Sequence, residues 1–304
     1  MSRTVLITGA GGFVGSHMAE GFAAMGDAVI ALDAAFDSRT RKRLAGVELI
    51  EAPVSADVLP YDRTVDLVIH GAAITTPPEE FGMSAEQHVA ANVAMLEDAL
   101  ALAVGHGASD FVFMSSSGVF SVDDGEGVQL ESTVPTATMP YAAAKRAGES
   151  ATAAAGSTTL RAISIRLGPI YGPHEASRGT RKIVSQVRRW LDRVESGEPI
   201  IVQMPEECRD WTFAPDLPRA LDALLAQEPK VSGVVHLTSA EIVSNLALAE
   251  MIAGLVDGAR VDVAPLGQAP RLPISSDRVD LQALYAWTPL RDGLAAIRNI
   301  EVAR

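Results

Sequence analysis

Short hydrophobic runs alternate with longer amphipathic stretches along the first half of the chain. The short runs predict β-strands at residues 4–8, 28–32, 47–51, 67–70, 111–114 and 162–166. The longer stretches predict helices at residues 14–25, 85–104 and 141–155. This alternation predicts an α/β fold, with a doubly wound parallel sheet covered by helices on both faces. Because the strands are short and apolar, we expect them to be buried on both sides.

The pattern changes after residue 166, where Gly-Pro turns interrupt it. A basic helical stretch follows at 181–193, then a strand at 234–237 and helices at 246–255 and 293–299. We therefore expect residues 167–304 to form mainly a smaller, interleaved substrate-binding region. The chain is expected to return to the first domain around residues 210–237.

The first predicted strand runs into a glycine turn that opens the first predicted helix. Glycine permits strained backbone angles and lets the backbone approach a pyrophosphate, whose charge is favoured at a helix N-terminus. Strand, turn and helix in this order indicate a Rossmann-type dinucleotide-binding domain at residues 1–166. A glycine turn that binds nothing is the alternative. The turn residues expected at the cofactor are Gly9, Gly12, Phe13, Val14 and Gly15.

Asp33 closes the second predicted strand, where a carboxylate accepts hydrogen bonds from the adenosine ribose. A carboxylate there repels a 2′-phosphate, which favours NAD over NADP. Arg39, Arg41, Lys42 and Arg43 follow. They could lie near a phosphate, but a solvated loop or helix start is the simpler interpretation.

Small residues follow the strand at 67–70. Gly71, Ala72 and Ala73 would let the backbone lie close to the cofactor, or would simply pack in the sheet. Asn92, in the next predicted helix, is expected to be satisfied locally or to brace a loop beside the cofactor.

Tyr141 and Lys145 are four residues apart in a predicted helix, so both project from one face. A free phenol, with a pKa of ~10, is a poor base at neutral pH. A cation about 4 Å away can favour the phenolate by up to ~4 kcal/mol at an effective dielectric of ~20. Tyr141 would then take a proton from a substrate hydroxyl as hydride passes to nicotinamide, while Lys145 holds phenolate and ribose. The structural alternative is a half-buried ring beside an amine that reaches to solvent.

Three serines end the strand at 111–114, at the edge where open α/β sheets bind ligands. Ser116 or Ser117 would donate a hydrogen bond to the substrate oxygen. Serines in this position are otherwise ordinary loop residues.

These segments together resemble the extended short-chain dehydrogenase/reductase family, in its NAD-dependent epimerase/dehydratase branch. The resemblance covers nearly the whole chain, and its motifs specify the superfamily rather than one substrate. They lie at residues 8–15, 70–73, 115–120, 166–173 and 209–216, with Asp33, Asn92 and the Tyr141-x-x-x-Lys145 pair.

The resemblance implies NAD as the cofactor and Ser116 as the catalytic hydroxyl, with Ser117 in reserve. It also implies a homodimer formed through the helices at 85–104 and 141–155. Ser117-Gly118 stands where the sugar-nucleotide dehydratases carry an acidic pair, so the resemblance disfavours dehydratase activity.

Other positions depart from the family pattern or leave two interpretations open. Pro53-Val54 replaces an aspartate that meets the adenine, which leaves the backbone of Val54 for that contact. Arg209 is expected to face a substrate phosphate or carboxylate, or to pair with Asp210 or Glu207.

Gly168 replaces an asparagine that contacts nucleotide sugars, which leaves room for a smaller substrate such as a sugar acid or polyol. The candidate substrate contacts are Thr75 and Thr76 as hydroxyls and His174, Arg178 or Arg181 as an anion clamp.

The amino-acid composition and net charge limit the classes of partner that the protein is expected to bind. The chain of 304 residues is 48% hydrophobic, enough for a sizeable core, and its net charge of −13 disfavours nucleic acids and anionic membranes. Cys208 is the single cysteine, and the scattered histidines indicate no metal site. We see no signal peptide and no apolar stretch near the ~18 residues of a membrane span, so we expect a cytoplasmic protein.

The leading hypothesis is an NAD-dependent, nucleotide-sugar epimerase-like enzyme that transfers hydride at a secondary hydroxyl of a sugar-type substrate. An NAD-dependent dehydrogenase of a small sugar acid or polyol is the first alternative. A non-catalytic NAD-sensing scaffold is the second, and the three candidate catalytic residues argue against it.

Overall fold

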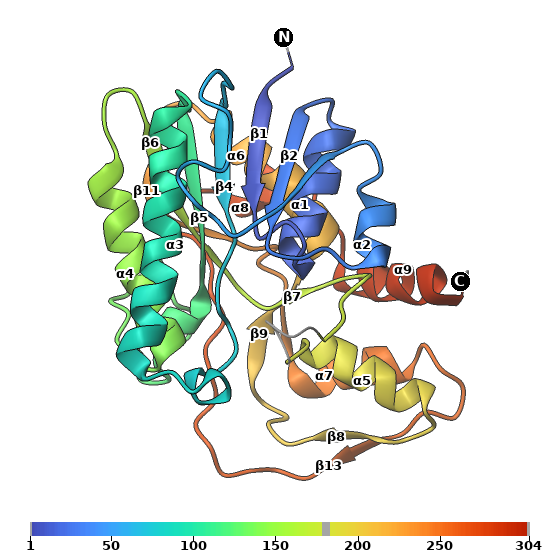
Figure 1. The fold of residues 1–304 in the computed structure, drawn as a ribbon. Helices are drawn as coiled ribbons and strands as arrows, with labels where there is room; N and C mark the ends of the chain where they lie inside the picture. The colour runs from blue at the N-terminus through green and yellow to red at the C-terminus, as the bar shows by residue number, and fades with distance from the viewer. Residues whose placement is uncertain (1, 178–182, 303–304) are drawn as a thin grey trace.

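The computed structural model describes residues 2–177 and 183–302 and contains a seven-stranded parallel sheet. The strand order is β11-β6-β5-β4-β1-β2-β3 (Figure 1). This arrangement confirms the predicted fold class. The strands are β1 (Thr4–Thr8), β2 (Ala28–Asp33), β3 (Glu48–Glu51), β4 (Leu67–His70), β5 (Asp110–Ser116), β6 (Arg161–Leu167) and β11 (Gly233–Leu237).

The strand order reverses at β1, which lies between β2 and β4. Ile7 of β1 is level with Ala31 on one side and with Ile69 on the other. The chain builds outward to β3 and then continues on the opposite side of β1. Ligands of open α/β sheets bind at such a switch point, outside the carboxyl ends of the strands.

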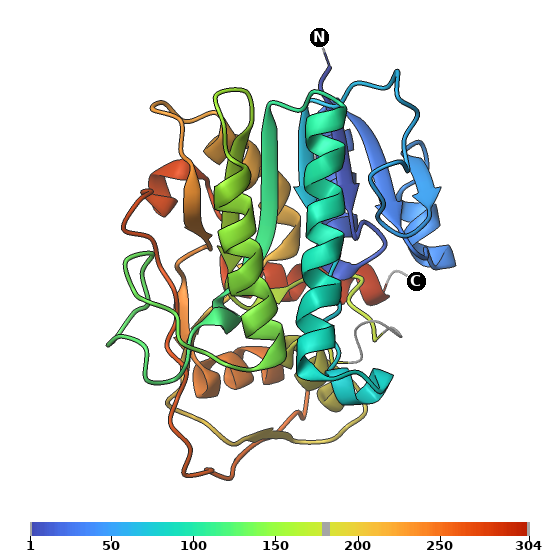
Figure 2. The same cartoon turned by 60° about the vertical axis from the view of Figure 1, so that its left-hand side comes forward.

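Helices cover both faces of the sheet because neighbouring strand residues point in opposite directions. Val5 and Ile7 pack in a core with α1 (Phe13–Ala24) and α6 (Leu217–Leu225). Leu6 packs in the opposite core with α3 (Ala85–Gly105). α3 and α4 (Pro140–Ala155) lie side by side on that second face (Figure 2).

The carboxyl-terminal region has a core of its own. Trp190 of α5 (Gln186–Glu195), Ile252 of α7 (Asn245–Ala253) and Leu294 of α9 (Leu290–Val302) pack together there. Three two-stranded pairs, β7–β10, β8–β13 and β9–β12, border it. The remaining elements are α2 (Ser38–Arg43), α8 (Leu281–Leu284), β7 (Ile170–Tyr171), β8 (Ile200–Val202), β9 (Cys208–Asp210), β10 (Thr212–Phe213), β12 (Ile242–Ser244), β13 (Val261–Val263) and the 3₁₀ turns η1 (Pro78–Phe81), η2 (Ser117–Val119) and η3 (Ala214–Asp216).

Two sequence predictions differ from the structure. β3 is not buried on both faces, because it lies at the sheet edge and its residues are exposed or half-buried. The helix predicted from residue 181 begins at Gln186, because the Ser185 side chain caps it by accepting from the backbone N–H of Arg188. Residues 181 and 182 lie outside the described residues.

The expectation that no segment is long and apolar enough for a membrane span was wrong for α3. Its 21 residues meet both criteria, and 28% of its most apolar window is buried. Core helices satisfy the same test, and α3 packs Leu96 and Leu102 against the sheet. Its first turn is fixed by a capping box between Ser84 and Gln87.

Candidate active site

The glycine turn between β1 and α1 is packed too closely for side chains. Gly9 has a φ of +71°, and a Cβ there would lie 2.6 Å from the backbone nitrogen of Ala72. A Cβ on Gly15 would collide with the carbonyl oxygen of Gly9. Gly12 is the N-cap of α1. Because glycine has no side chain, it offers no side-chain acceptor to the first backbone N–H groups of α1. This cradle fits the pyrophosphate of a dinucleotide.

Asp33 lies against this turn at the end of β2. Its Oδ2 accepts from the backbone N–H of Gly11 at 2.9 Å, and its Oδ1 accepts from Ala35 at 3.1 Å. The carboxylate is therefore held at the mouth of the glycine turn. Val54 is half-buried beyond β3, the strand next to β2. Their contacts to ribose and adenine stay predictions.

A cleft of about 300 Å³ opens beside the glycine turn. Gly11, Gly12 and Phe13 form one wall, and α2 contributes Arg39 and Arg43 to the other. The cleft therefore brings the turn backbone and two cationic side chains together, which suits a phosphate group.

Arg43 is the more buried of these arginines, with 11% of its side chain exposed. Its Nη1 donates to Ser16 Oγ at 3.2 Å, and its Nη2 pairs with Glu20. Its Nε is buried without a hydrogen-bond partner in the described part of the chain. Arg41 instead pairs with Glu51. The basic run is thus a helix start, as expected, but Arg43 is not a solvated side chain.

The end of β4 is tied to the end of β1. His70 Nδ1 lies 2.8 Å from Thr8 Oγ1, which also accepts from the backbone N–H of Ala72 at 3.3 Å. Burial, with a smaller effect of Lys145, lowers the pKa of His70 to about 3, so its ring is neutral. Gly71 N–H donates to the carbonyl oxygen of Thr8 at 3.0 Å. These bonds fix the loop that begins at β4.

Asn92 braces the same loop. Its Oδ1 accepts from the backbone N–H of Ile74 at 2.9 Å, and its Nδ2 donates to the carbonyl oxygen of His88 at 2.9 Å. The predicted bracing role is therefore observed, while contacts of Asn92 and Ala73 to the cofactor stay predictions.

Tyr141 and Lys145 share one face of α4 and line a small cavity with Ala72 and Asn92. Lys145 Nζ donates to the carbonyl oxygen of Met114 at 2.7 Å and lies 5.7 Å from the centroid of the Tyr141 ring. Tyr141 is half-buried, whereas Lys145 is 6% exposed. Burial lowers the pKa of Lys145 to about 8, although the carboxylate of Glu149 raises it. The candidate base and the predicted cofactor loop thus face the same space.

Ser116 ends β5 next to Tyr141. Its Oγ accepts from the backbone N–H of Gly118 at 3.0 Å. A Cβ on Gly118 would lie 3.3 Å from Ser116 Oγ and 3.5 Å from Cε1 of Tyr141, so both groups border this glycine. Ser115 bonds to Glu149 in the interior, and Ser117 begins η2. Ser116 is therefore the serine whose place best fits the predicted role.

The predicted substrate contacts do not form one cluster. His174 lines the cleft beside the glycine turn and stacks with His17, rather than lining the cavity of Tyr141. Thr75 is exposed on the loop after β4, whereas Thr76 is buried. Arg178 lies outside the described residues.

Arg209 on β9 is largely enclosed, with 13% of its side chain exposed. Nη1 lies 3.7 Å from Glu207 Oε1, and Nε is buried without a hydrogen-bond partner among the described residues. Burial lowers its pKa, although Asp210 and Glu207 raise it. The predicted ion pair with Glu207 is present but long, and the predicted contact of Arg209 with a substrate phosphate or carboxylate stays a prediction.

Sequence reasoning missed the place of Arg43 in the cleft and the role of Glu149. Glu149 follows Lys145 by four residues, so its helical spacing could have placed it on the same face. No local signal marks Arg43, because its position depends on contacts with Ser16 and Glu20 of α1. Among the described residues, no three His, Cys, Asp or Glu side chains cluster as metal ligands.

The chain is similar in sequence and in structure to known proteins. The family model described as NAD dependent epimerase/dehydratase family matches residues 5–236. A Bacillus subtilis protein named uncharacterized UDP-glucose epimerase YtcB is 24% identical over 261 residues, covering 82% of this chain and 80% of that protein. A Streptomyces dTDP-4-dehydro-6-deoxy-D-allose reductase is 28% identical, covering 96% and 94%. The structure of MoeE5 in complex with UDP-glucose and NAD matches with a TM-score of 0.77 and 25% identity, covering 99% of each chain.

Proposed function

The chain belongs to the NAD dependent epimerase/dehydratase family, and we propose that it is a nucleotide-sugar epimerase-like enzyme that acts on a secondary hydroxyl. One observation carries this proposal. The candidate base Tyr141 and its cation Lys145 line the same cavity as Ala72 and Asn92, which follow β4 at the ligand-binding edge of the sheet. Family membership agrees with the resemblance in the motifs and with NAD as the cofactor.

NAD fits the residues at this edge. The glycine turn and Arg43 would hold its phosphates, Asp33 its adenosine ribose, and Lys145 its second ribose. When bound, NAD supplies the hydride acceptor for oxidation of the substrate carbon. Tyr141 takes the proton from the substrate hydroxyl, and the ammonium of Lys145 favours the phenolate that accepts it. Ser116 Oγ donates a hydrogen bond to the substrate oxygen as charge develops there.

Substrate chemistry separates two candidate reactions. Two observations support the epimerase. A relative is named as a UDP-glucose epimerase. The enclosed Arg209 would bind a substrate phosphate. The second candidate is net oxidation of a small sugar acid or polyol. Gly168 favours it, because a Cβ there would collide with the carboxylate of Asp210, so no side chain can reach a nucleotide from this position.

A panel of nucleotide sugars and sugar acids incubated with the NAD-loaded protein tests both. We expect an isomerised sugar by NMR without accumulation of NADH absorbance. Stoichiometric NADH would instead identify a dehydrogenase, and loss of water from the sugar would identify a dehydratase. No turnover of any member, with NAD bound, would contradict the enzymatic proposal for these substrate classes.

The proposal includes a homodimer formed through α3 and α4. The two helices lie side by side on one face and expose small residues, among them Ala90, Ala94 and Ala153, which permit close helix approach. Val104 is 68% exposed at the end of α3. Analytical ultracentrifugation of the native protein measures whether it is a homodimer.

Replacing Arg43 by methionine should weaken NAD binding roughly tenfold, because a charge-assisted hydrogen bond contributes on the order of 1.5 kcal/mol. Calorimetric titration with NAD measures the change. Arg41→Met is the matched control, since Arg41 lies on the same helix but pairs with Glu51 away from the cleft. Equal affinities of the two variants would show that Arg43 does not contact the cofactor.

A further inference from the structure

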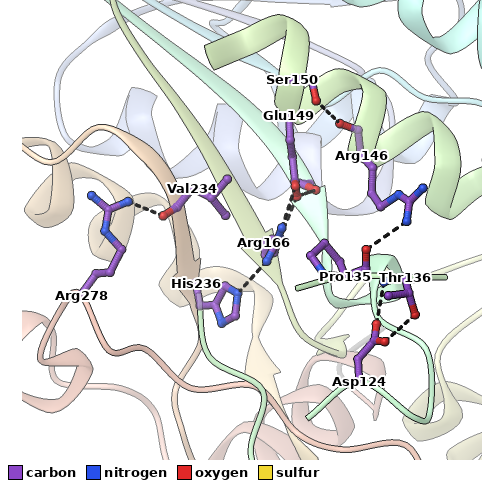
Figure 3. A network of polar contacts seen from close by, with 11 residues as sticks. Asp124, Pro135, Thr136, Arg146, Glu149, Ser150, Arg166, Val234, His236 and Arg278 are labelled. Atoms are coloured by element: carbon purple, nitrogen blue, oxygen red, sulfur yellow. Dashed lines mark hydrogen bonds and ion pairs between the residues drawn. The ribbon is translucent and has the colours of Figure 1, made fainter. Parts of the chain in front are cut away.

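A buried ion pair joins the helix of Tyr141 and Lys145 to the sheet. Glu149 follows Lys145 by one turn of α4 and reaches Arg166 on β6 (Figure 3). Arg166 Nε donates to Glu149 Oε1 at 2.8 Å, and Nη2 donates to Oε2 at 2.7 Å. The two side chains are 8% and 5% exposed. This planar arrangement of two bonds fixes the direction of both groups.

The same carboxylate holds the strand end that leads into Ser116. Ser115 Oγ donates to Glu149 Oε1 at 2.6 Å in the interior. Ser115 and Arg166 are level with each other in neighbouring strands, so one carboxylate bonds to both β5 and β6. By holding Ser115, the carboxylate also fixes the backbone from which the chain continues into Ser116.

Arg166 also supports the far side of the Ser116 turn. Its guanidinium carbon lies 4.9 Å from the ring centroid of Phe120, which follows η2. Its Nη1 lies 3.5 Å from His236 Nε2 (Figure 3). His236 Nδ1 lies 2.7 Å from the carbonyl oxygen of Ser275. Burial lowers the pKa of His236 to about 4, so a neutral ring donates at Nδ1 and accepts from Arg166 at Nε2. The ion pair of Glu149 and Arg166 thus contacts the chain on both sides of Ser116, at Ser115 before it and at Phe120 after it.

Glu149 also supplies the negative charge nearest in sequence to Lys145 on this face of α4. Its carboxylate favours the protonated amine and opposes the effect of burial on the pKa of Lys145. The other groups around Lys145 are Tyr141 on α4, neutral His70 on β4, uncharged Asn92 on α3 and, behind Glu149, Arg166 on β6.

We propose that Glu149, held by Arg166, is a positioning residue that fixes Ser116 against Tyr141 and keeps Lys145 protonated. Such a pair need not stabilise the fold, because the desolvation of two buried charges can exceed their mutual attraction. The kinetic part of this inference rests on the proposed function. The protonation of Lys145 does not, since it is measurable without a substrate.

Glu149→Gln tests the proposal, because the amide keeps the size of the side chain and removes its charge. We expect kcat to fall by roughly 10–100-fold, as a displacement of about 1 Å can cost ~100-fold, with KM little changed. We also expect the alkaline limb of kcat to move to lower pH by about one unit, because Lys145 loses its proton more readily.

Titration by NMR of the NAD-loaded protein with ¹³C-labelled lysine side chains measures that shift directly. The chain has four lysines, Lys42, Lys145, Lys182 and Lys230, so the Lys145 signal is identified by its loss in Lys145→Met. In Glu149→Gln the Lys145 signal should titrate at lower pH than in the wild type.

Asp110→Asn is the matched control. Asp110 pairs with Arg161 across the same two strands, at their amino ends, far along the sheet from Ser116. It should leave kcat and the Lys145 titration unchanged. If Glu149→Gln behaves like Asp110→Asn in kcat or in the Lys145 titration, the proposal is overturned.

Ser115→Ala keeps the ion pair and removes only its link to β5, so it provides the test if Glu149→Gln fails to fold. Here kcat should fall without a shift of the Lys145 titration, and an unchanged kcat would overturn the positioning of Ser116. If the wild type turns over no substrate, the proposed function fails, while the Lys145 titration still decides whether Glu149 controls its charge.

Discussion

Tyr141→Phe should reduce kcat by roughly 10²–10⁴-fold while NAD still binds, because general base catalysis contributes about that much. The variant removes one oxygen and leaves the half-buried ring in place beside Lys145. Loss of the phenol therefore removes the proton acceptor without opening the cavity. Single-turnover measurements at saturating substrate, with calorimetry of NAD binding, separate the two effects.

Tyr61→Phe is the control, since that side chain is 92% exposed on the surface and lines neither cavity described here. It should match the wild type in kcat. Retention of turnover in Tyr141→Phe would rule out Tyr141 as the base. A protein without turnover whose cellular role survives Tyr141→Phe would instead support the NAD-sensing scaffold.

Lys145→Met should reduce kcat by roughly 10²–10³-fold, because the phenolate loses the cation that favours it. NAD binding should also weaken, as the amine that would contact the ribose is lost. Steady-state kinetics and NAD titration measure both effects. Lys230→Met, at an exposed position, is the control and should change neither. Wild-type kcat in Lys145→Met would contradict the assignment of the amine.

The same substitution should stabilise the fold at neutral pH. Burial lowers the pKa of Lys145 from 10.5 to about 8, so the folded state disfavours the protonated amine. The penalty is present below pH 8 and is relieved as the pH rises to 10.5, so wild-type stability should increase across that window. The penalty is on the order of 3 kcal/mol, and the lost hydrogen bond to Met114 offsets part of it.

Denaturant unfolding at several pH values checks this prediction. Lys145→Met should exceed the wild type by about 1–2 kcal/mol below pH 8, and the difference should vanish toward pH 10.5. A variant that is less stable than the wild type at pH 7 would show that burial of the protonated amine does not destabilise the folded state.

The central sheet was predictable because its signals are local. The apolar runs at residues 4–8 and 67–70 coincide with β1 and β4, since buried strands between helices need continuous apolar sequence. The Tyr141 and Lys145 pair was predictable for the same reason, because helical spacing alone places both on one face. The glycine turn was predictable because its glycines lie between the first strand and the first helix, as in a dinucleotide-binding turn.

Features that depend on distant segments were not predictable. The short strands β8 and β13 pair across about sixty residues, and no local pattern encodes which strand pairs with which. Edge exposure of β3 depends on the strand order rather than on its sequence. The roles of Arg43 and Glu149 depend on which side chains they meet, namely Ser16 and Arg166, and no spacing in the chain encodes those contacts.

β11 has a consequence for the order in which the protein can mature on the ribosome. Until residue 237 has left the exit tunnel, β6 presents an unpaired strand edge, because β11 is the strand that pairs with its outer side. α6, which packs on α1, also arrives late in translation. A nascent chain that stops near residue 166 would therefore expose unpaired backbone N–H and C=O groups and apolar surface. Chaperones bind such features.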